Sequence, residues 1–145
     1  MGYAIAVMAM VFVLMVGNVQ WRESAGYQAQ AMNRTADSLA ADMLRLASGV
    51  NDWRYYRTPD EGNLNTRQFG LVPLPDNRIN AAIRHGRLWL WLPEQQGLVA
   101  SLNRQSANST LVGIIAGGRL RMADGTDMNL SLPAGVAEGN IVYLN

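Results

Sequence analysis

The longest apolar stretch of the chain lies at its N-terminal end, where residues 2–19 carry no charged side chain. A helix of this length rises about 27 Å, which is close to the thickness of a bilayer hydrocarbon core. Tyr3 and Trp21 flank the stretch as interfacial aromatics, and Arg22 is the first charge after it. This pattern predicts a membrane-spanning helix over residues 1–21.

Two other interpretations compete with a span. A cleaved signal peptide would have early basic residues, but this segment has none, and Glu23-Ser24-Ala25 is a poor cleavage site. A buried core helix would have to hide a helix that is apolar on every face inside a small domain. We favour a single span, and the absence of a dense basic cluster after residue 21 favours a periplasmic position for the rest of the chain.

A second apolar pattern follows at helical spacing, alternating four and three residues. Its members are Ala25, Ala29, Met32, Ala36, Leu39, Met43, Leu46 and Val50. The pattern predicts an amphipathic helix over residues 22–52 that continues from the span and ends near residue 50, where Ser48-Gly49 is a stop signal. We expect the stripe to pack on the chain's own sheet, with a neighbouring transmembrane subunit as the alternative.

The segment 51–78 is rich in Pro, Gly, Asn and Asp, which is typical of connecting structure. Trp53, Tyr55 and Tyr56 form an aromatic cluster at its start. We expect these rings to cap the core where the helix meets the sheet, and a partner-binding patch is the alternative.

Alternating and β-branched residues then predict strands. The predicted strands cover 79–84, 87–92, 110–116, 119–122, 128–132 and 140–144. His85-Gly86, Gly117-Gly118 and Asp124-Gly125 are the turn signals between them, and residues 94–108 predict a short second helix. The fold class is therefore α+β, with a long N-terminal helix packed on an antiparallel sheet, and residues 53–145 form one domain together with 22–52.

The strand at 87–92 is apolar on both faces. One face then lies under a helix and the other under a loop or a partner. We expect Trp89 and Trp91 to be incompletely covered in so small a domain, which makes them candidate partner contacts beside Trp53, Tyr55 and Tyr56.

Charge and composition limit the classes of ligand and reaction that the chain can serve. The 12 basic residues, all Arg, and 11 acidic residues are spread without blocks and give a net charge of +1, which argues against a nucleic-acid partner. The chain has no Cys and no Lys, and His85 is its only histidine. We therefore predict no catalytic, metal or cofactor site, and the protein is not expected to be an enzyme.

Three segments carry a resemblance to a known family. They are MGYAIAVMAMVFVLMVGNVQW, the helix around residues 31–36, and the tail LPAG through GNIVY at 132–143. The whole chain resembles the small inner-membrane PilM proteins of thin, type IVB pilus operons on IncI-group conjugative plasmids. The resemblance implies a non-catalytic inner-membrane component of the pilus machinery or basal body, working with other assembly proteins. It implies no catalytic residues, and a homo-oligomer is compatible with it.

The layout also looks like a type IV pilin, in which an apolar helix continues into an amphipathic half on an antiparallel sheet. The chain departs from that pattern because Val7 stands where a pilin has Glu and no basic leader precedes it. A minor pilin-like subunit and a generic single-pass adaptor are the alternative functions.

Overall fold

The structure, a computed structural model, describes residues 2–108 and 111–145, with side chains for 3–13, 30–31, 34–108 and 111–145. It divides into two compact units, Met1–Arg34 and Thr35–Asn145. The elements are α1 (Gly2–Tyr55), β1 (Gly62–Leu64), β2 (Asn80–Arg84), β3 (Arg87–Leu92), α2 (Leu98–Gln105), β4 (Val112–Ala116), β5 (Arg119–Met122) and β6 (Ile141–Leu144).

The N-terminal unit consists of the first part of α1, and its described side chains at residues 3–13 are exposed. Trp21 and Arg22, predicted to flank a span, lie outside the described side chains. Within the part of the chain that was described, no helix combines the length and the apolar character needed to cross a membrane. The span predicted over residues 1–21 is therefore not supported by the structure.

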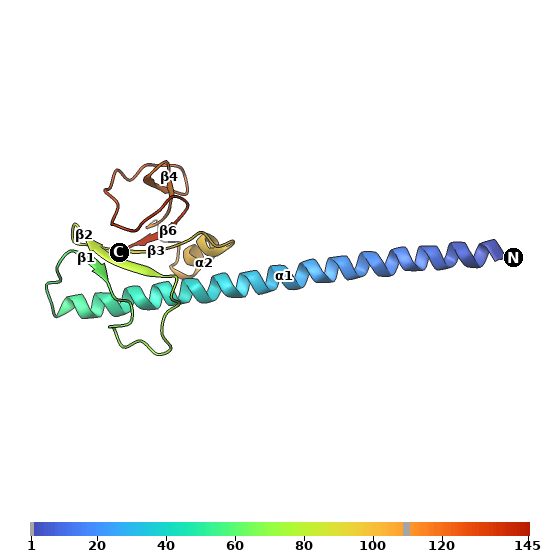
Figure 1. The fold of residues 1–145 in the computed structure, drawn as a ribbon, viewed down its shortest axis with the longest axis horizontal. Coiled ribbons are helices and arrows are strands. Elements are labelled where there is room, and N and C mark those ends of the chain that lie inside the picture. The colour runs from blue at the N-terminus through green and yellow to red at the C-terminus, as the bar shows by residue number, and fades with distance from the viewer. Residues whose placement is uncertain (1, 109–110) are drawn as a thin grey trace. The chain divides into compact units, whose positions relative to one another are not determined.

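The second unit is built on a six-stranded sheet in the order β1-β2-β3-β6-β4-β5. Every pair of neighbouring strands is antiparallel. The last strand, β6, lies in the middle, because it pairs with β3 on one side and β4 on the other. The α+β class and the antiparallel sheet predicted from the sequence are thus confirmed (Figure 1).

Two turns of the sheet follow directly from the sequence. His85 and Gly86 both have positive φ, 49° and 73°, and join β2 to β3. Gly117 and Gly118 do the same between β4 and β5, with φ of 63° and 69°. Two successive residues with positive φ match the right-handed twist of a two-residue hairpin, so both predicted turns are confirmed.

One face of the sheet is covered by α1. Leu39, Met43 and Leu46 of α1 are buried against Leu88 and Leu90 of β3 in one apolar cluster. The predicted stripe is therefore confirmed as buried on the chain's own sheet from Ala36 to Val50, while Ala25, Ala29 and Met32 lie outside the described side chains.

Polar contacts join α2 to α1. The Asp37 carboxylate accepts hydrogen bonds from the Ser101 hydroxyl, at 2.5 Å, and from the Arg104 guanidinium. The Gln105 amide donates to the Asp37 carbonyl at 3.0 Å. Ser101 is buried, so its hydroxyl needs this partner, and the contact fixes how α2 lies on α1.

The opposite face of the sheet is covered by the irregular segment 127–140 (Figure 1). Trp89, Trp91, Val142 and Leu144 point to this face, because side chains alternate along a strand. The covering side chains are Met128, Leu130, Leu132 and Val136. A loop, and not a second helix or a partner, therefore completes this part of the core.

The predicted strand over residues 128–132 was wrong. Residues 128–132 contain no strand or bridge; the neighbouring Asp127 forms a single bridge with Arg121, and the Met128 N–H donates to the Leu120 carbonyl. Asn129 has φ of 49°, which takes the chain out of the extended conformation. The alternation of apolar residues nevertheless describes which side chains face the core.

The helix boundaries also differ from the prediction. α1 continues through Gly49 to Tyr55. Leu71 of the following loop packs on the helix here, since a Cβ added at Gly49 would lie 3.3 Å from it. α2 begins at Leu98 because Gly97, with φ of 80°, caps it in the left-handed conformation. β1, a three-residue edge strand, was not predicted.

Candidate functional site

The described carboxylates mainly stabilise turns. Glu138 accepts the backbone N–H groups of Gly117 and Gly118, at 2.8 and 3.0 Å, and these bonds lower the pKa of its carboxyl. Asp127 accepts from the Arg119 guanidinium at 2.7 Å, and that bond lowers its pKa in the same way. Each carboxylate is thus held in its charged form by donors of the fold.

The groups singled out for chemistry are dispersed. His85 lies in the β2–β3 turn. Its backbone N–H donates to the Glu61 carboxylate at 2.7 Å, and its ring Nε2 is 3.3 Å from the Ser131 hydroxyl. Over the described residues, no group of three or more His, Cys, Asp or Glu side chains gathers into a metal site. These contacts describe a stabilised turn.

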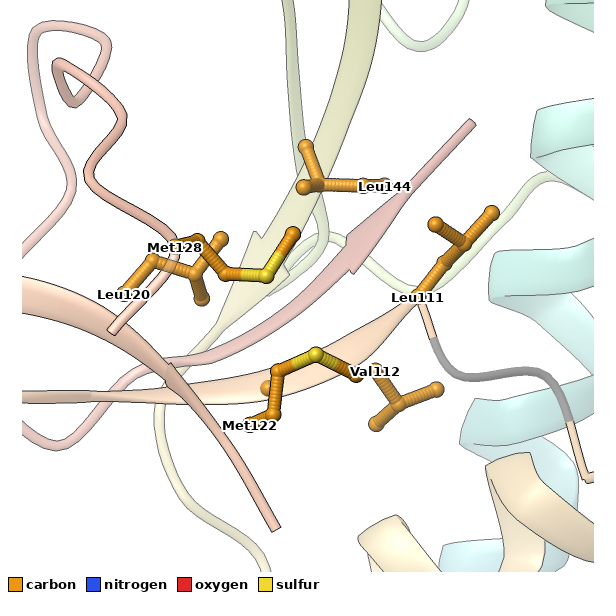
Figure 2. Close-up of a pocket in the computed structure, with 7 residues that line it drawn as sticks. Leu111, Val112, Leu120, Met122, Met128 and Leu144 are labelled. Carbon is orange, nitrogen blue, oxygen red and sulfur yellow. The ribbon is translucent and has the colours of Figure 1, made fainter. Parts of the chain in front are cut away.

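A small pocket opens on the loop-covered face of the sheet (Figure 2). Its cavity volume is about 10 Å³, which is room for about one water molecule. It is lined by Leu111, Val112, Gly113, Leu120, Met122, Met128 and Leu144. None of these side chains titrates, so the pocket offers no acid, base or nucleophile.

Position 113, which lines the pocket, has no room for a side chain. A Cβ on Gly113 would lie 2.6 Å from the Arg121 carbonyl oxygen and 2.9 Å from Leu120. Glycine therefore permits the close approach of β4 and β5 at this point.

The last turn of α1 exposes aromatic side chains. Tyr55 and Tyr56 are each 83% exposed, and their rings meet edge to face at 5.0 Å. Trp53 is half-buried and packs edge to face on Phe69, with ring centroids 5.6 Å apart. Only Trp53 therefore takes part in packing as predicted, whereas the two tyrosines do not cap the core.

Two arginines lie on the same segment as these rings. The Arg57 guanidinium lies 5.8 Å from the centre of the Trp53 ring, and Arg54 donates to the Gly86 carbonyl at 2.5 Å. The second contact joins the end of α1 to the β2–β3 turn, where Arg84 and Arg87 face each other across the two strands. Side chains alternate along the strands, so Arg84 and Arg87 point to the loop-covered face, where Arg84 lies near Ala82 and Pro133. We call the segment of Trp53, Arg54, Tyr55, Tyr56 and Arg57 the aromatic–arginine end.

The guanidinium groups at this end have no carboxylate partners within the described residues. The ion pairs described in the structure involve Arg45, Arg78, Arg104 and Arg119. The Nε atom of Arg84, on the loop-covered face, is buried and has no hydrogen-bond partner among the described residues. Exposed tyrosines on the same segment as arginines that lack carboxylate partners have the composition of protein-binding hot spots.

Trp89 and Trp91 do not belong to this surface. They are 1% and 3% exposed and lie beneath the covering loop, so the expectation that this pair is incompletely covered was wrong. The sequence did not reveal that the loop would cover them. The loop lies so close that a Cβ added at Gly135 would be 3.6 Å from the Trp91 ring.

The arginines are the part of the surface that the sequence analysis missed. Arg54 and Arg57 flank the tyrosines in the sequence, and this was the available signal.

Comparisons with known proteins agree with this fold. The crystal structure of the PilM protein from Escherichia coli B7A is similar, with a TM-score of 0.63 and 29% sequence identity over 77% of this chain and 92% of that one. No curated protein matches the sequence. The PilM family profile matches residues 10–144, nearly the whole sequence. The chain therefore belongs to the PilM family.

Proposed function

We propose that this protein is a non-catalytic inner-membrane component of the type IVB pilus machinery that assembles conjugative thin pili. Its role is to hold other assembly subunits in place. Family membership over residues 10–144 is the observation that carries the proposal. A pilus assembly protein of this kind needs binding surfaces and no active site.

Membrane attachment is assigned to the N-terminal unit. Residues 2–19 carry no charge, and the described side chains at 3–13 are apolar and exposed. A continuous apolar surface of this kind is unfavourable in water, and a bilayer would cover it on every side. We place the remainder of the chain in the periplasm, since no basic cluster follows this stretch.

Protease accessibility tests this placement. Protease added to intact spheroplasts should digest residues 35–145, leaving a membrane-bound N-terminal fragment. Protection in intact spheroplasts, with digestion only after lysis, would contradict the orientation. Recovery of the whole chain in the wash of salt-treated membranes would contradict the anchor itself.

Complementation tests the scaffold role. His85→Ala, Asp60→Asn and Glu61→Gln should each restore piliation and mating in liquid to a strain lacking the gene. Deletion of residues 2–19 should restore neither, because the domain would lose its position at the membrane. A turnover activity that depends on Asp60 or Glu61, or full function without the anchor, would contradict the proposal.

A minor pilin-like subunit is the second candidate. The observation in its favour is α1, a single helix over Gly2–Tyr55 whose second part packs on an antiparallel sheet. Shearing pili from cells separates the two functions. A scaffold stays with the membranes, whereas a pilin-like subunit leaves with the fibres.

A further inference from the structure

We infer that β1 is the docking edge of the sheet, to which an extended segment of a partner protein adds as a seventh strand. The inference rests on the proposed function and specifies how this protein holds another assembly subunit. The backbone of the segment pairs with the backbone of Asn63. One uncharged polar side chain of the segment enters a groove beside β1.

The two edges of the sheet differ in what covers them. At β5, the chain's own following residues bond to the outward backbone groups. The Met128 N–H donates to the Leu120 carbonyl at 3.0 Å, and the Met122 N–H donates to the Thr126 carbonyl at 2.9 Å. At the other edge, β1 pairs with β2 on its inner side, and no described segment pairs with its outer side. β1 is therefore the edge that is open to another chain.

The hydrogen-bond pattern of the sheet fixes which backbone groups β1 presents. Leu88 of β3 exchanges two backbone bonds with Asn145, at 2.9 and 3.0 Å, so its N–H and carbonyl point away from β2. Its partner across the hairpin is Ile83, whose backbone groups therefore point toward β1 and its partner Gly62. Because these directions alternate along a strand, the N–H and the carbonyl of Asn63 both point to the open side.

Asn63 offers both groups to a partner. The residue is exposed, and no described residue beyond the sheet bonds to its backbone N–H or carbonyl. The Cβ position of Gly62 has no atom within 4 Å, so the space beside Asn63 is open as well. A donor and an acceptor at one edge residue are the complement of one residue of an added strand, whose backbone then supplies affinity.

A groove beside this edge supplies the selectivity. Its volume is about 390 Å³, and its lining includes Asn63, Ala82 and Arg84 of the sheet and Pro133 and Ala134 of the covering segment. Asn63 pairs with Ala82, which belongs to the loop-covered face. A residue of the added strand that pairs with Asn63 therefore places its side chain on the same face, at the groove.

The charges of the groove determine which side chain it accepts. The Glu61 carboxylate and the Arg84 guanidinium both line it, and their charges offset each other. Neither an acidic nor a basic side chain would therefore find a net complementary charge. An uncharged polar side chain such as Gln or Thr can both donate and accept hydrogen bonds here without burying a charge.

Cysteine crosslinking tests the inference, because the chain has no Cys of its own. The full-length protein in membranes of piliated cells carries Ala134→Cys, an exposed position in the groove, labelled with benzophenone maleimide. The crosslinked segment is mapped by mass spectrometry. We expect an adduct with a segment of another protein that is uncharged at the crosslinked position. An adduct with a charged position, with lipid or with a second copy of this chain would overturn the inference, as would the absence of an adduct.

Two variants at one position separate strand addition from simple contact. Asn63→Pro removes the outward N–H and places a ring against the added strand, while the β1–β2 bonds of Gly62 and Leu64 stay in place. The adduct should fall about tenfold or more. Asn63→Ala keeps both backbone groups and is the matched control, which should retain about half of the adduct or more. Equal adducts in the two variants would overturn the inference.

A third variant serves if Asn63→Pro loses its cooperative melt. Asn63→Lys changes only an exposed side chain, and a charge on an edge strand opposes pairing with another strand. This variant should also give less adduct than Asn63→Ala. An adduct as strong as that of the alanine variant would count against strand addition.

The inference and the proposed function fail separately. An adduct that is lost in Asn63→Pro but joins a protein outside the pilus machinery would uphold the inference and contradict the proposed function. An adduct with a pilus subunit that is undiminished in Asn63→Pro would do the reverse.

Discussion

The two faces of the sheet bury similar side chains beneath different covers. Leu88 and Leu90 lie under α1, a regular helix that supplies one side chain per turn to the core. Trp89 and Trp91, one position along on the same strand, lie under the irregular segment 127–140. One strand therefore contributes to both halves of the core, and its position between two covers explains why it is apolar from Leu88 to Leu92.

The difference lies in what holds each cover in place. α1 is held by its own backbone hydrogen bonds and by apolar burial, so its stripe repeats at helical spacing. The loop has few internal backbone bonds and depends on local contacts, such as Glu138 with the Gly117–Gly118 turn. We therefore expect the helix-covered face to govern global unfolding and the loop-covered face to tolerate smaller changes.

The largest effect is expected from a charge on the helix-covered face. Leu46→Asp in the full-length protein would bury an unpaired carboxylate at a site that is 0% exposed, and should cost more than about 4 kcal/mol of the free energy of unfolding. Thermal unfolding followed by circular dichroism should lose its cooperative transition. An unchanged melt together with loss of pili would show that the stripe faces a partner.

Truncation on the loop-covered face should have the next largest effect. Trp89→Ala removes a buried ring and should cost about 3 to 5 kcal/mol in chemical denaturation. Trp89→Phe should cost less than half of that, because the indole Nε1 has no hydrogen-bond partner among the described residues and its removal relieves an unpaired donor. Equal costs for both variants would mean that the indole N–H is paired in solution.

Two glycines compare a position where a new Cβ would meet backbone with one where it would meet a side chain. Gly113→Ala should cost about 1 to 3 kcal/mol, because the new Cβ would meet the Arg121 carbonyl oxygen, a backbone atom, at 2.6 Å. Gly49→Ala should change stability by less than about 1 kcal/mol, because its Cβ meets only the side chain of Leu71, and alanine favours the helix. The reverse order in urea melts would contradict this comparison.

The smallest effect concerns pH. A hydrogen bond from the Arg78 guanidinium lowers the pKa of Asp76 from 3.8 to about 2. Because the folded-state pKa is below the unfolded value, this contribution is present above about pH 4 and is lost as the pH falls from 4 to 2. Asp76→Asn should flatten the decline of stability in this window, by at most about 1 kcal/mol since the pair is partly exposed. An equally steep decline in both proteins would exclude the pair as its source.

Periodic features were predictable from the sequence because they follow from backbone geometry. The run of strand-forming residues in 87–92 and the His85-Gly86 pair define a hairpin locally, and the spacing from Ala36 to Val50 defines the buried side of α1. These elements could be predicted without knowledge of distant residues.

The remaining features depend on contacts between distant parts of the chain. Ser48-Gly49 resembles a helix stop, but Leu71 packs over Gly49 and α1 continues. Trp89 and Trp91 were expected near the surface, but the 127–140 segment covers them. The end of α1 is joined to the β2–β3 turn by a hydrogen bond from Arg54 to the carbonyl of Gly86, 32 positions later in the sequence. No local pattern predicts this contact.

Piliation of a double tyrosine variant tests the central claim, that exposed side chains of the domain serve binding and the two covered faces serve stability. Tyr55→Ser with Tyr56→Ser changes two exposed rings, and Val72→Ser, at a side chain that is 90% exposed, is the matched control. The account predicts that the double variant loses pili and liquid mating at unchanged protein abundance and melting temperature, while the control keeps both. Normal piliation in the double variant would contradict it.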